Sequence, residues 1–324
     1  MKNQLVILLT VLLFPLAGFS QNEFPRDTSY AVWSDWQKIK KDYPEVIPVA
    51  EFKSDQFLTL PNQVYRVRDN RILRMDVFIP NCDPGKKRPL VMMIHGGGWR
   101  SGDKSHLVPL AQKLAMEGYV TASVEQRLSM EALYPAAPQD LKEAIRYLKH
   151  NCDVYGIDTT RIAVLGASSG ATMASLMATT GTIDKFDDPE SVYPHHTAEV
   201  QALINVDGVV DFTDPNESAK DTNPDKPSAG ALFFGCTYKE CPEKWVEASP
   251  IQYAGKDTPP TLYVNSAQPR FHAGRDELFK VLDQYGIYHE QHTIDNSPHT
   301  FWLFHPWFED THSFILNFLN HVFQ

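Results

Sequence analysis

One short stretch, Gly166-Ala-Ser-Ser-Gly170, constrains the fold of this chain more than any other. An apolar run at 161–166 leads into it, and residues 171–177 follow with helical spacing. The pattern G-x-S-x-G between a strand and a helix is typical of a nucleophile elbow, a tight turn that holds a serine hydroxyl clear of the sheet. A helix that starts there also points its first amides at an anion forming on a substrate. The pattern is short enough to fit an idle glycine-rich turn equally well, so the prediction of Ser168 as a nucleophile depends on the rest of the chain.

A run of three glycines supplies a second part of the predicted site. Residues His95 to Gly98 follow the apolar run 89–94, which is expected of a strand buried on both faces. Consecutive glycines let the backbone approach a substrate and turn its amides toward it. Such a turn forms one half of an oxyanion hole, and the amide after the nucleophile forms the other half. We therefore expect the amides of Gly97, Gly98 and Ser169 to hold the oxyanion.

A serine hydroxyl needs a base to accept its proton, and His299 is the predicted base. It lies between the last predicted strand, 288–294, and the last predicted helix, 310–323. Hydrolases with this elbow have the order serine, acid, histidine along the chain, so a histidine near the C-terminus is expected. His305 is better explained by packing among its aromatic neighbours.

The acid that orients this histidine has two candidates. In related hydrolases it usually follows the strand that we predict at 261–264, but no carboxylate directly follows that strand. Asp207 lies at the tip of the preceding strand, 200–206, and Asp276 lies one turn into the next helix. We favour Asp207 and keep Asp276 as the alternative. Either carboxylate would fix the tautomer of His299 and support its charged form.

Strands and helices alternate along most of the chain. A hairpin is predicted at 63–79, followed by strands at 89–94, 119–124, 161–165, 200–206, 260–264 and 288–294, and by helices at 107–117, 138–150, 275–285 and 310–323. This alternation predicts an α/β fold with a mostly parallel sheet of about eight strands and helices on both faces. Two stretches, 182–196 and 213–247, interrupt the alternation. We expect both to leave the sheet at the carboxyl ends of its strands, where ligands bind, and to form lid or specificity loops.

The chain begins with a segment that resembles an export signal. Residues 1–4 are a short basic start, 5–17 are an apolar run too short to span a bilayer, and the small residues in 18–20 fit a cleavage site. We therefore predict a signal peptide at 1–20 and a periplasmic or secreted protein.

The remaining residues, 21–324, are predicted to form a single domain in which 21–60 wrap around the core. The formal net charge is −10 and no long basic stretch occurs, which argues against a nucleic-acid partner. No segment after the leader suits a membrane span, so no membrane partner is expected.

Four cysteines occur in the chain, and in an exported protein they can form disulfides in three ways. Cys236 and Cys241 are near enough in sequence to close a small loop. Cys82 and Cys152 are both expected at the end of the sheet away from the elbow. Free thiols are the alternative for both pairs. No cysteine or histidine cluster has zinc spacing, so neither a metal nor a cofactor is expected.

Three further residues are candidates for binding substrate. Arg270 and Arg275 form a dense positive cluster near the predicted site, which suits the carboxylate of a uronate. The same arginines can instead pair with acidic residues at the start of a helix, at Asp276 and Glu277. Trp99 follows the glycine turn and is a candidate for stacking against a sugar ring, whereas most other aromatic residues are expected in the core.

Several stretches resemble known proteins. Residues 95–104, 126–135 and 166–170 are similar to the carboxylesterase branch of the α/β-hydrolases, and this resemblance covers about residues 60–324. Residues 269–276 and 298–308 look like exported bacterial esterases associated with pectin breakdown. The resemblance implies the α/β-hydrolase fold and the removal of methyl or acetyl esters from plant polysaccharide. The absence of an acid after the strand at 261–264 departs from the family pattern.

We therefore expect a serine carboxylesterase that acts on esterified plant cell-wall polysaccharide without a cofactor. Methyl esters of pectin are the first expectation, because the arginine cluster suits a uronate, and acetyl or feruloyl esters of xylan or pectin are the alternative. A peptidase of the prolyl-oligopeptidase type would need a second, propeller-sized domain, which the chain lacks. A non-catalytic glycan-binding protein remains a rival if the acid is lost. The export signal disfavours an intracellular thioesterase or lipid esterase.

Overall fold

The computed structural model of this chain describes residues 27–68, 71–82, 85–221, 223 and 225–324. The predicted signal peptide at 1–20 lies outside the described residues. No helix in the described part of the chain has the length and apolar character needed to cross a membrane.

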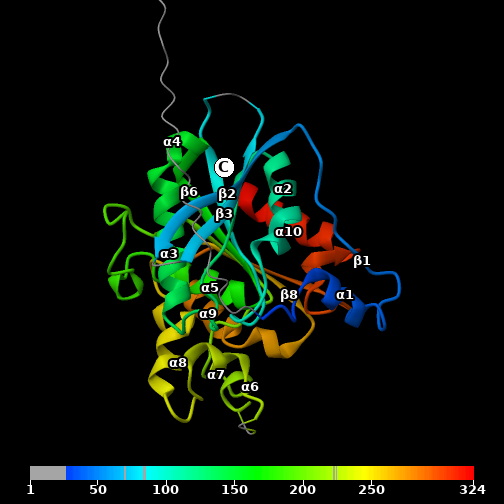
Figure 1. The fold of residues 1–324 in the computed structure, drawn as a ribbon, viewed down its shortest axis with the longest axis vertical. Coiled ribbons are helices and arrows are strands. Elements are labelled where there is room, and N and C mark those ends of the chain that lie inside the picture. Colours follow the sequence, from blue (N-terminus) through cyan, green and yellow to red (C-terminus); the bar gives the residue numbers. More distant parts are fainter. Residues whose placement is uncertain (1–26, 69–70, 83–84, 222, 224) are drawn as a thin grey trace, which may run out of the picture.

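The core of the molecule is an eight-stranded sheet with the strand order β2-β3-β5-β4-β6-β7-β8-β9 (Figure 1). Its strands are β2 (Phe57–Arg68), β3 (Arg71–Pro80), β4 (Arg88–Ile94), β5 (Val120–Val124), β6 (Ile157–Ala167), β7 (Ala202–Val206), β8 (Thr261–Ser266) and β9 (His289–Ile294). β3 pairs antiparallel with both β2 and β5, and every other pairing in this sheet is parallel. The predicted, mostly parallel sheet is therefore confirmed. The first strand of the hairpin begins at Phe57, earlier than the sequence indicated.

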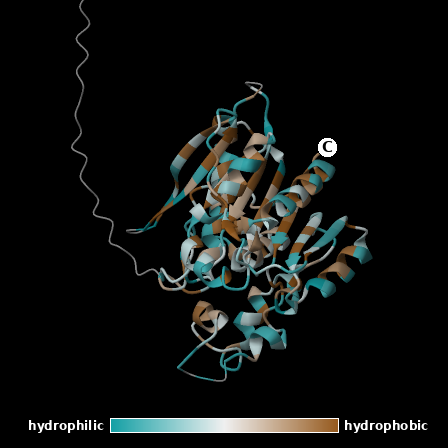
Figure 2. Ribbon diagram, turned by 90° about the vertical axis from the view of Figure 1, so that its right-hand side faces the viewer, coloured by the Kyte–Doolittle hydropathy of each residue, from teal (hydrophilic) through white to brown (hydrophobic). Residues whose placement is uncertain are grey.

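Helices cover both faces of this sheet, because its central strands are apolar on both sides. Along β4, Leu90 and Met92 belong to one core, whereas Val91 and Met93 belong to the other. Figure 2 shows hydrophobic residues concentrated along these central strands. The first core includes α3 (Ala136–His150) and α5 (Ser169–Thr179), and the second includes α2 (Val108–Met116) and α10 (Trp307–Val322). α9 (Arg275–Tyr285) packs separately on Tyr263 of β8.

Strand order places two loops side by side at the site. β5 and β6 lie on opposite sides of β4, so the connections that leave the carboxyl ends of β4 and β6 run in different directions. Such a switch point is where open parallel sheets bind ligands. The glycine turn follows β4 and the serine elbow follows β6, so both predicted halves of the oxyanion hole reach this crevice.

The described part of the N-terminal wrap supports the segment that carries His299. It contains α1 (Val32–Ile39), and β1 (Ile47–Pro48) pairs antiparallel with β10 (Phe304–His305). The indole of Trp36 donates to the carbonyl of Val46 at 2.9 Å, and Thr300 donates to the carboxylate of Asp35. These contacts tie the N-terminal segment to the loop directly after the predicted base.

The stretch 182–196 does not lie where the sequence analysis expected it. It follows α5, which starts at the elbow and runs back along the sheet, so the stretch precedes β7 instead of following a strand. The buried ammonium of Lys142 on α3 binds the carbonyl of Ile183 at 2.6 Å and Asp187 at 2.9 Å. Arg146, on the same helix, also pairs with Asp187. The prediction that this stretch leaves the sheet at the carboxyl end of a strand is therefore wrong, because it follows a helix and is held by charged groups of α3.

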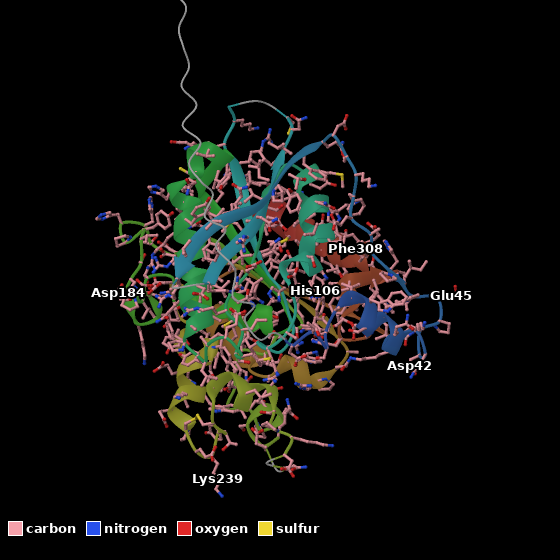
Figure 3. All side chains as sticks on the ribbon, in the orientation of Figure 1. Asp42, Glu45, His106, Asp184, Lys239 and Phe308 are labelled. Atoms are coloured by element: carbon pink, nitrogen blue, oxygen red, sulfur yellow. A yellow bond between two sulfur atoms is a disulfide. The ribbon has the colours of Figure 1, made fainter. Side chains whose placement is uncertain are left out.

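The second insertion, 213–247, does follow a strand and carries the short helices α6 (Pro215–Ser218), α7 (Ala229–Phe234) and α8 (Pro242–Ala248). Asp184, in the stretch 182–196, and Lys239, in 213–247, lie on different sides of the molecule in Figure 3. Of the two insertions, only the second supplies residues, Glu217 and Ala229, to the pocket beside Ser168.

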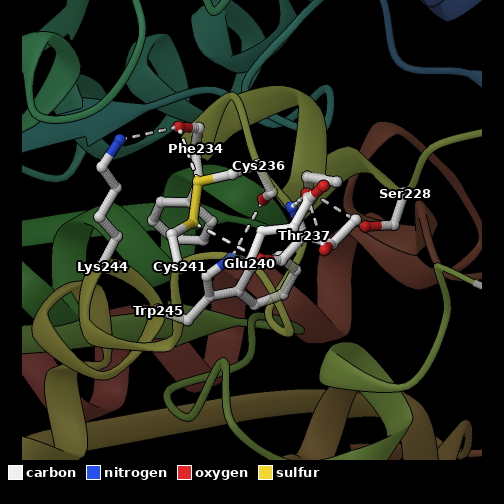
Figure 4. Close-up of a disulfide and its surroundings, with 9 residues drawn as sticks. Ser228, Phe234, Cys236, Thr237, Glu240, Cys241, Lys244 and Trp245 are labelled. Atoms are coloured by element: carbon white, nitrogen blue, oxygen red, sulfur yellow. Dashed lines mark hydrogen bonds between the residues drawn. A yellow bond between two sulfur atoms is a disulfide. The ribbon is translucent and has the colours of Figure 1, made fainter.

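A disulfide between Cys236 and Cys241 joins the end of α7 to the start of α8 (Figure 4). The indole of Trp245, which is fully buried beneath it, donates to the carbonyl of Cys236 at 3.3 Å. Cys82 and Cys152 are free in the structure, so the second bridge considered from the sequence is not formed.

Replacing both Cys236 and Cys241 by serine should lower the free energy of unfolding by about 2 kcal/mol, because the unfolded chain loses a short covalent loop. Denaturant unfolding followed by tryptophan fluorescence measures this difference. Cys82→Ser is the matched control and should leave the unfolding curve unchanged. Identical curves for the double variant and the wild type would contradict the expectation.

Candidate active site

The elbow at Ser168 depends on two glycines that no other residue can replace. Ser168 has φ 53° and ψ −125°, between the end of β6 and the first residue of α5. This backbone region is strained for a residue with a side chain. A Cβ atom on Gly166 would lie 2.0 Å from the carbonyl oxygen of Gly170, and one on Gly170 would lie 2.2 Å from that of Ile94. The backbones therefore lie too close together for side chains at Gly166 and Gly170. Ser168, between them, lies at the tip of the turn.

Three side chains from distant parts of the chain meet at this elbow. Nε2 of His299 lies 2.8 Å from the hydroxyl oxygen of Ser168, and Nδ1 lies 2.6 Å from Oδ2 of Asp207. A proton on Nδ1 is donated to the carboxylate, which leaves Nε2 free to accept the serine proton. The structure thus brings Ser168, His299 and Asp207 into one hydrogen-bonded chain.

The carboxylate of Asp207 is fully buried and is held by the end of the neighbouring strand β8. Its Oδ1 accepts from the amide of Ser266 at 2.9 Å and from the side chain of Asn265 at 3.2 Å. Its Oδ2 accepts from the hydroxyl of Ser266 at 2.7 Å. The end of β8, where a carboxylate is absent, supplies hydrogen-bond donors to a carboxylate on β7.

The alternative acid, Asp276, is not near His299. Its carboxylate binds the guanidinium of Arg275 at 2.8 Å, and its side chain is 66% exposed. The structure therefore brings Asp207, and not Asp276, to the histidine.

Two aromatic rings fix the plane of His299. The ring of Phe271 stacks on the imidazole, with centroids 3.6 Å apart and an angle of 5° between the planes. The edge of Trp302 meets the imidazole at 5.3 Å and 89°. The sequence analysis did not single out Phe271, which directly follows a predicted site residue, Arg270.

The glycine turn lies against the elbow, as the fold requires. A Cβ atom on Gly96 would lie 3.0 Å from the Cβ of Ser168, and one on Gly97 would lie 2.1 Å from the carbonyl oxygen of Ser101. Gly98 and Ser169 line a pocket together with Ser168, whereas Gly97 is not among its lining residues. Two of the three predicted oxyanion residues, Gly98 and Ser169, thus border the pocket.

A buried histidine pair supports the glycine turn from behind. His106, in the centre of Figure 3, meets His95 edge-on at 6.2 Å. Burial, together with the nearby His95, lowers the pKa of His106 to about 4. His106 is therefore neutral at pH 7 and places no positive charge behind the turn.

The pocket beside Ser168 is small, with a volume of about 50 Å³. It is lined by Gly98, Trp99, Ser168, Ser169, Thr172, Asp207, Gly208, Val209, Glu217, Ala229, Arg270 and Phe271. The indole nitrogen of Trp99 and the hydroxyl of Thr172 are buried and have no hydrogen-bond partner among the described residues. Because buried polar atoms are normally paired, a bound water or a substrate oxygen suits this pocket.

Trp99 borders the pocket but presents little of its ring. It is only 9% exposed, and it stacks on Phe233 at 5.2 Å and contacts Phe212 at 5.1 Å. The described residues thus leave no broad indole face on which a sugar ring could stack.

The two arginines that were expected to form one cluster bind different partners. Arg275 is 8% exposed and binds Asn265 at 3.1 Å as well as Asp276, so it supports the end of β8. Arg270 lines the pocket, and its Nε binds Oε1 of Glu217 at 3.1 Å. Glu217 was not predicted, because it lies in an insertion whose sequence has no strand or helix period.

In the described part of the chain, no group of three or more His, Cys, Asp or Glu side chains is suited to hold a metal ion. The groups described at the site are a hydroxyl, an imidazole, a carboxylate and backbone amides. A hydroxyl bonded to an imidazole, which is bonded in turn to a carboxylate, is an arrangement that can attack a carbonyl carbon.

Comparison with known proteins identifies relatives of this arrangement. The model of the family named BD-FAE matches residues 75–271. Esterase LipQ of Mycobacterium tuberculosis is 28% identical over 184 residues, covering 56% of this chain and 42% of the relative. The probable carboxylic ester hydrolase LipM of the same organism is 25% identical over 224 residues, covering 68% of this chain and 48% of the relative. The chain thus spans about half the length of these curated relatives.

Solved structures share the fold. A truncated form of a carbohydrate esterase from gut microbiota has a TM-score of 0.70 and 21% identity, covering 84% of this chain and all of that one. A bifunctional GH43-CE protein of Bacteroides eggerthii has a TM-score of 0.69 and 22% identity, covering 81% of this chain and 38% of that one.

Replacing Asp207 by asparagine should lower kcat for ester hydrolysis by about 10⁴-fold, because an amide no longer selects the tautomer of His299 that leaves Nε2 free. Circular dichroism should show that the variant is folded. Asp276→Asn is the matched control and should change kcat little. A large loss in the control, or none in Asp207→Asn, would contradict this assignment.

Proposed function

The chain belongs to the BD-FAE family and has the α/β-hydrolase fold, and on this premise we propose that it is a serine ester hydrolase acting on esterified plant cell-wall carbohydrate. The observation that carries the proposal is the position of His299, whose two ring nitrogens lie 2.8 Å from Ser168 and 2.6 Å from Asp207. Export, expected from the leader, is part of the same proposal and fits a polymeric substrate outside the cell.

The chemistry follows from the roles of these groups. Nε2 of His299 takes the proton of Ser168 as the serine oxygen attacks the ester carbonyl, and the amides of Gly97, Gly98 and Ser169 stabilise the oxyanion. The charged imidazole, stabilised by the carboxylate of Asp207, then gives its proton to the departing alcohol. Water, activated by the same histidine, releases the acyl group from the serine.

Acetyl esters are the substrate that the pocket favours. The leaving alcohol must lie near His299, which protonates it. We assign the acyl group to the part of the pocket lined by Thr172, Gly208 and Val209, which we call the acyl floor. A volume of about 50 Å³ accommodates a few water-sized groups, such as an acetyl group, because one water needs roughly 10–15 Å³ on this measure. A feruloyl group is much larger.

Pectin methyl ester is the second candidate, because Arg270 borders the pocket and is 53% exposed. In that reaction the galacturonate is the acyl part, so a whole sugar ring would have to fit on the acyl side of this small pocket. The sequence analysis ranked the methyl ester first because two arginines could bind a uronate. Arg275 is not available for this, because it binds Asn265 and Asp276. The methyl ester therefore moves behind the acetyl ester.

Two measurements test the proposal together. A fluorophosphonate probe should label the wild type and the exposed-site control Ser105→Ala, but not Ser168→Ala, because only an activated serine reacts. On a pectin that carries both esters, acetate release should exceed methanol release. Absence of labelling would leave a non-catalytic glycan-binding protein, and methanol as the main product would reverse the order of the two esters.

A further inference from the structure

The rim of the pocket carries a charged pair that the hydrolytic chemistry does not use. The carboxylate of Glu217 comes from α6, in the insertion after β7, and the guanidinium of Arg270 comes from the loop after β8. Both line the pocket beside Ser168. Glu217 is only 6% exposed, and a carboxylate is rarely buried to this degree unless it is paired or has a function.

Half of this carboxylate remains available to a ligand. Oε1 of Glu217 accepts both partners, Nε of Arg270 at 3.1 Å and Nζ of Lys220 at 2.5 Å. Among the described residues, no hydrogen bond or ion pair reaches Oε2, and the terminal nitrogens of Arg270 likewise have no partner. Glu217 and Arg270 both line the pocket, and each carries polar atoms without a partner in the described part of the chain, one acceptor oxygen and two donor nitrogens. The ion pairs of Oε1 with Arg270 and Lys220 hold this arrangement.

The pair lies on the side of the pocket where the leaving alcohol must be. Cζ of Arg270 lies 4.9 Å from the centroid of the Phe271 ring, and that ring stacks on His299 at 3.6 Å. The contacts thus run from the histidine that protonates the alcohol, through Phe271 and Arg270, to Glu217. A group attached to the alcohol oxygen would therefore lie close to the ion pair of Glu217 and Arg270.

The carboxylate of Glu217 is bound by two cations, Arg270 and Lys220, so charge alone does not decide which group is recognised here. The remaining oxygen Oε2 is a hydrogen-bond acceptor, and it needs a donor that an ionised carboxylate of a substrate lacks. Hydroxyl groups suit the pair, because a hydroxyl can donate to Oε2 of Glu217 and also accept from Arg270.

We propose that Glu217, held by Arg270, is the specificity-determining residue for the alcohol part of the substrate, and that it binds a free hydroxyl group next to the esterified position of the sugar. This inference rests on the proposed ester hydrolysis and adds the recognition of the leaving group to it. The acyl floor then selects the small acid, and the Glu217–Arg270 pair selects the sugar that leaves.

Two esters with the same acyl group separate recognition of the alcohol from catalysis. Methyl β-D-xylopyranoside carrying a single acetyl group has free neighbouring hydroxyls, whereas p-nitrophenyl acetate has none. For Glu217→Gln, kcat/KM on the sugar acetate should fall about 10- to 100-fold more than kcat/KM on the aryl acetate, as expected for loss of a hydrogen bond to a charged group. With the remaining sugar hydroxyls methylated, this difference between the variant and the wild type should disappear.

Two further variants test the proposal independently of Glu217→Gln and control for the loss of any carboxylate in the insertion. Arg270→Gln, at a half-exposed position, should also lower kcat/KM on the sugar acetate more than on the aryl acetate, which keeps the proposal testable if Glu217→Gln folds poorly. Glu243→Gln, an exposed carboxylate of the same insertion, is the matched control and should behave as the wild type does on both esters.

The failures can be told apart. Equal losses on both esters would show that Glu217 only holds the loops, and no loss on either would show that it has no part in binding; either result overturns the inference. Hydrolysis of the aryl acetate but not of the sugar acetate by the wild type would overturn the inference while leaving the esterase proposal intact. Hydrolysis of neither ester, together with no labelling of Ser168, would overturn the esterase proposal itself.

Discussion

The site depends on one buried carboxylate and on the groups that donate hydrogen bonds to it. Asp207 has no exposed surface, and burying a carboxylate costs free energy unless hydrogen bonds replace those of water. Three hydrogen bonds from Asn265 and Ser266 satisfy it, and the fourth goes to His299. Because Asn265 and Ser266 end β8 and His299 follows β9, the register of three adjacent parallel strands determines whether the serine has a working base.

Close contact between backbones is the second constraint, and it explains the glycine-rich motifs. The elbow, the helix after it and the turn after β4 approach one another so closely that side chains at Gly96, Gly166 and Gly170 would collide with neighbouring atoms. The strained backbone of Ser168 is tolerated because these contacts fix it from several sides. The same closeness brings the amides of Ser169 and Gly98 to one pocket, so the oxyanion donors and the nucleophile are parts of a single backbone arrangement.

The sequence predicted the parts of the site that belong to this backbone arrangement, and it missed the parts that belong to loops. Ser168 and His299 could be identified because a glycine pattern and a fixed order along the chain point to them, and Asp207 because it ends a strand. Phe271 and Glu217 could not, since each lies in a segment without strand or helix periodicity. The sheet itself was predictable because its strands are continuous apolar runs, whereas the position of 182–196 depends on ion pairs with α3 that no local pattern indicates.

This division between scaffold and loops also determines where specificity can arise. The catalytic chain of hydrogen bonds tolerates little movement, since every member is held by a strand end or a close backbone contact. The insertion after β7 is held differently, by a disulfide above the buried Trp245 and by the contact of Glu217 with Arg270. Arg270 directly precedes Phe271, whose ring stacks on His299. The insertion is thus linked to the catalytic base through one ion pair and one stacking contact. The residues that recognise a sugar can therefore diverge in this insertion, while the carboxylate, the imidazole and the hydroxyl keep their geometry.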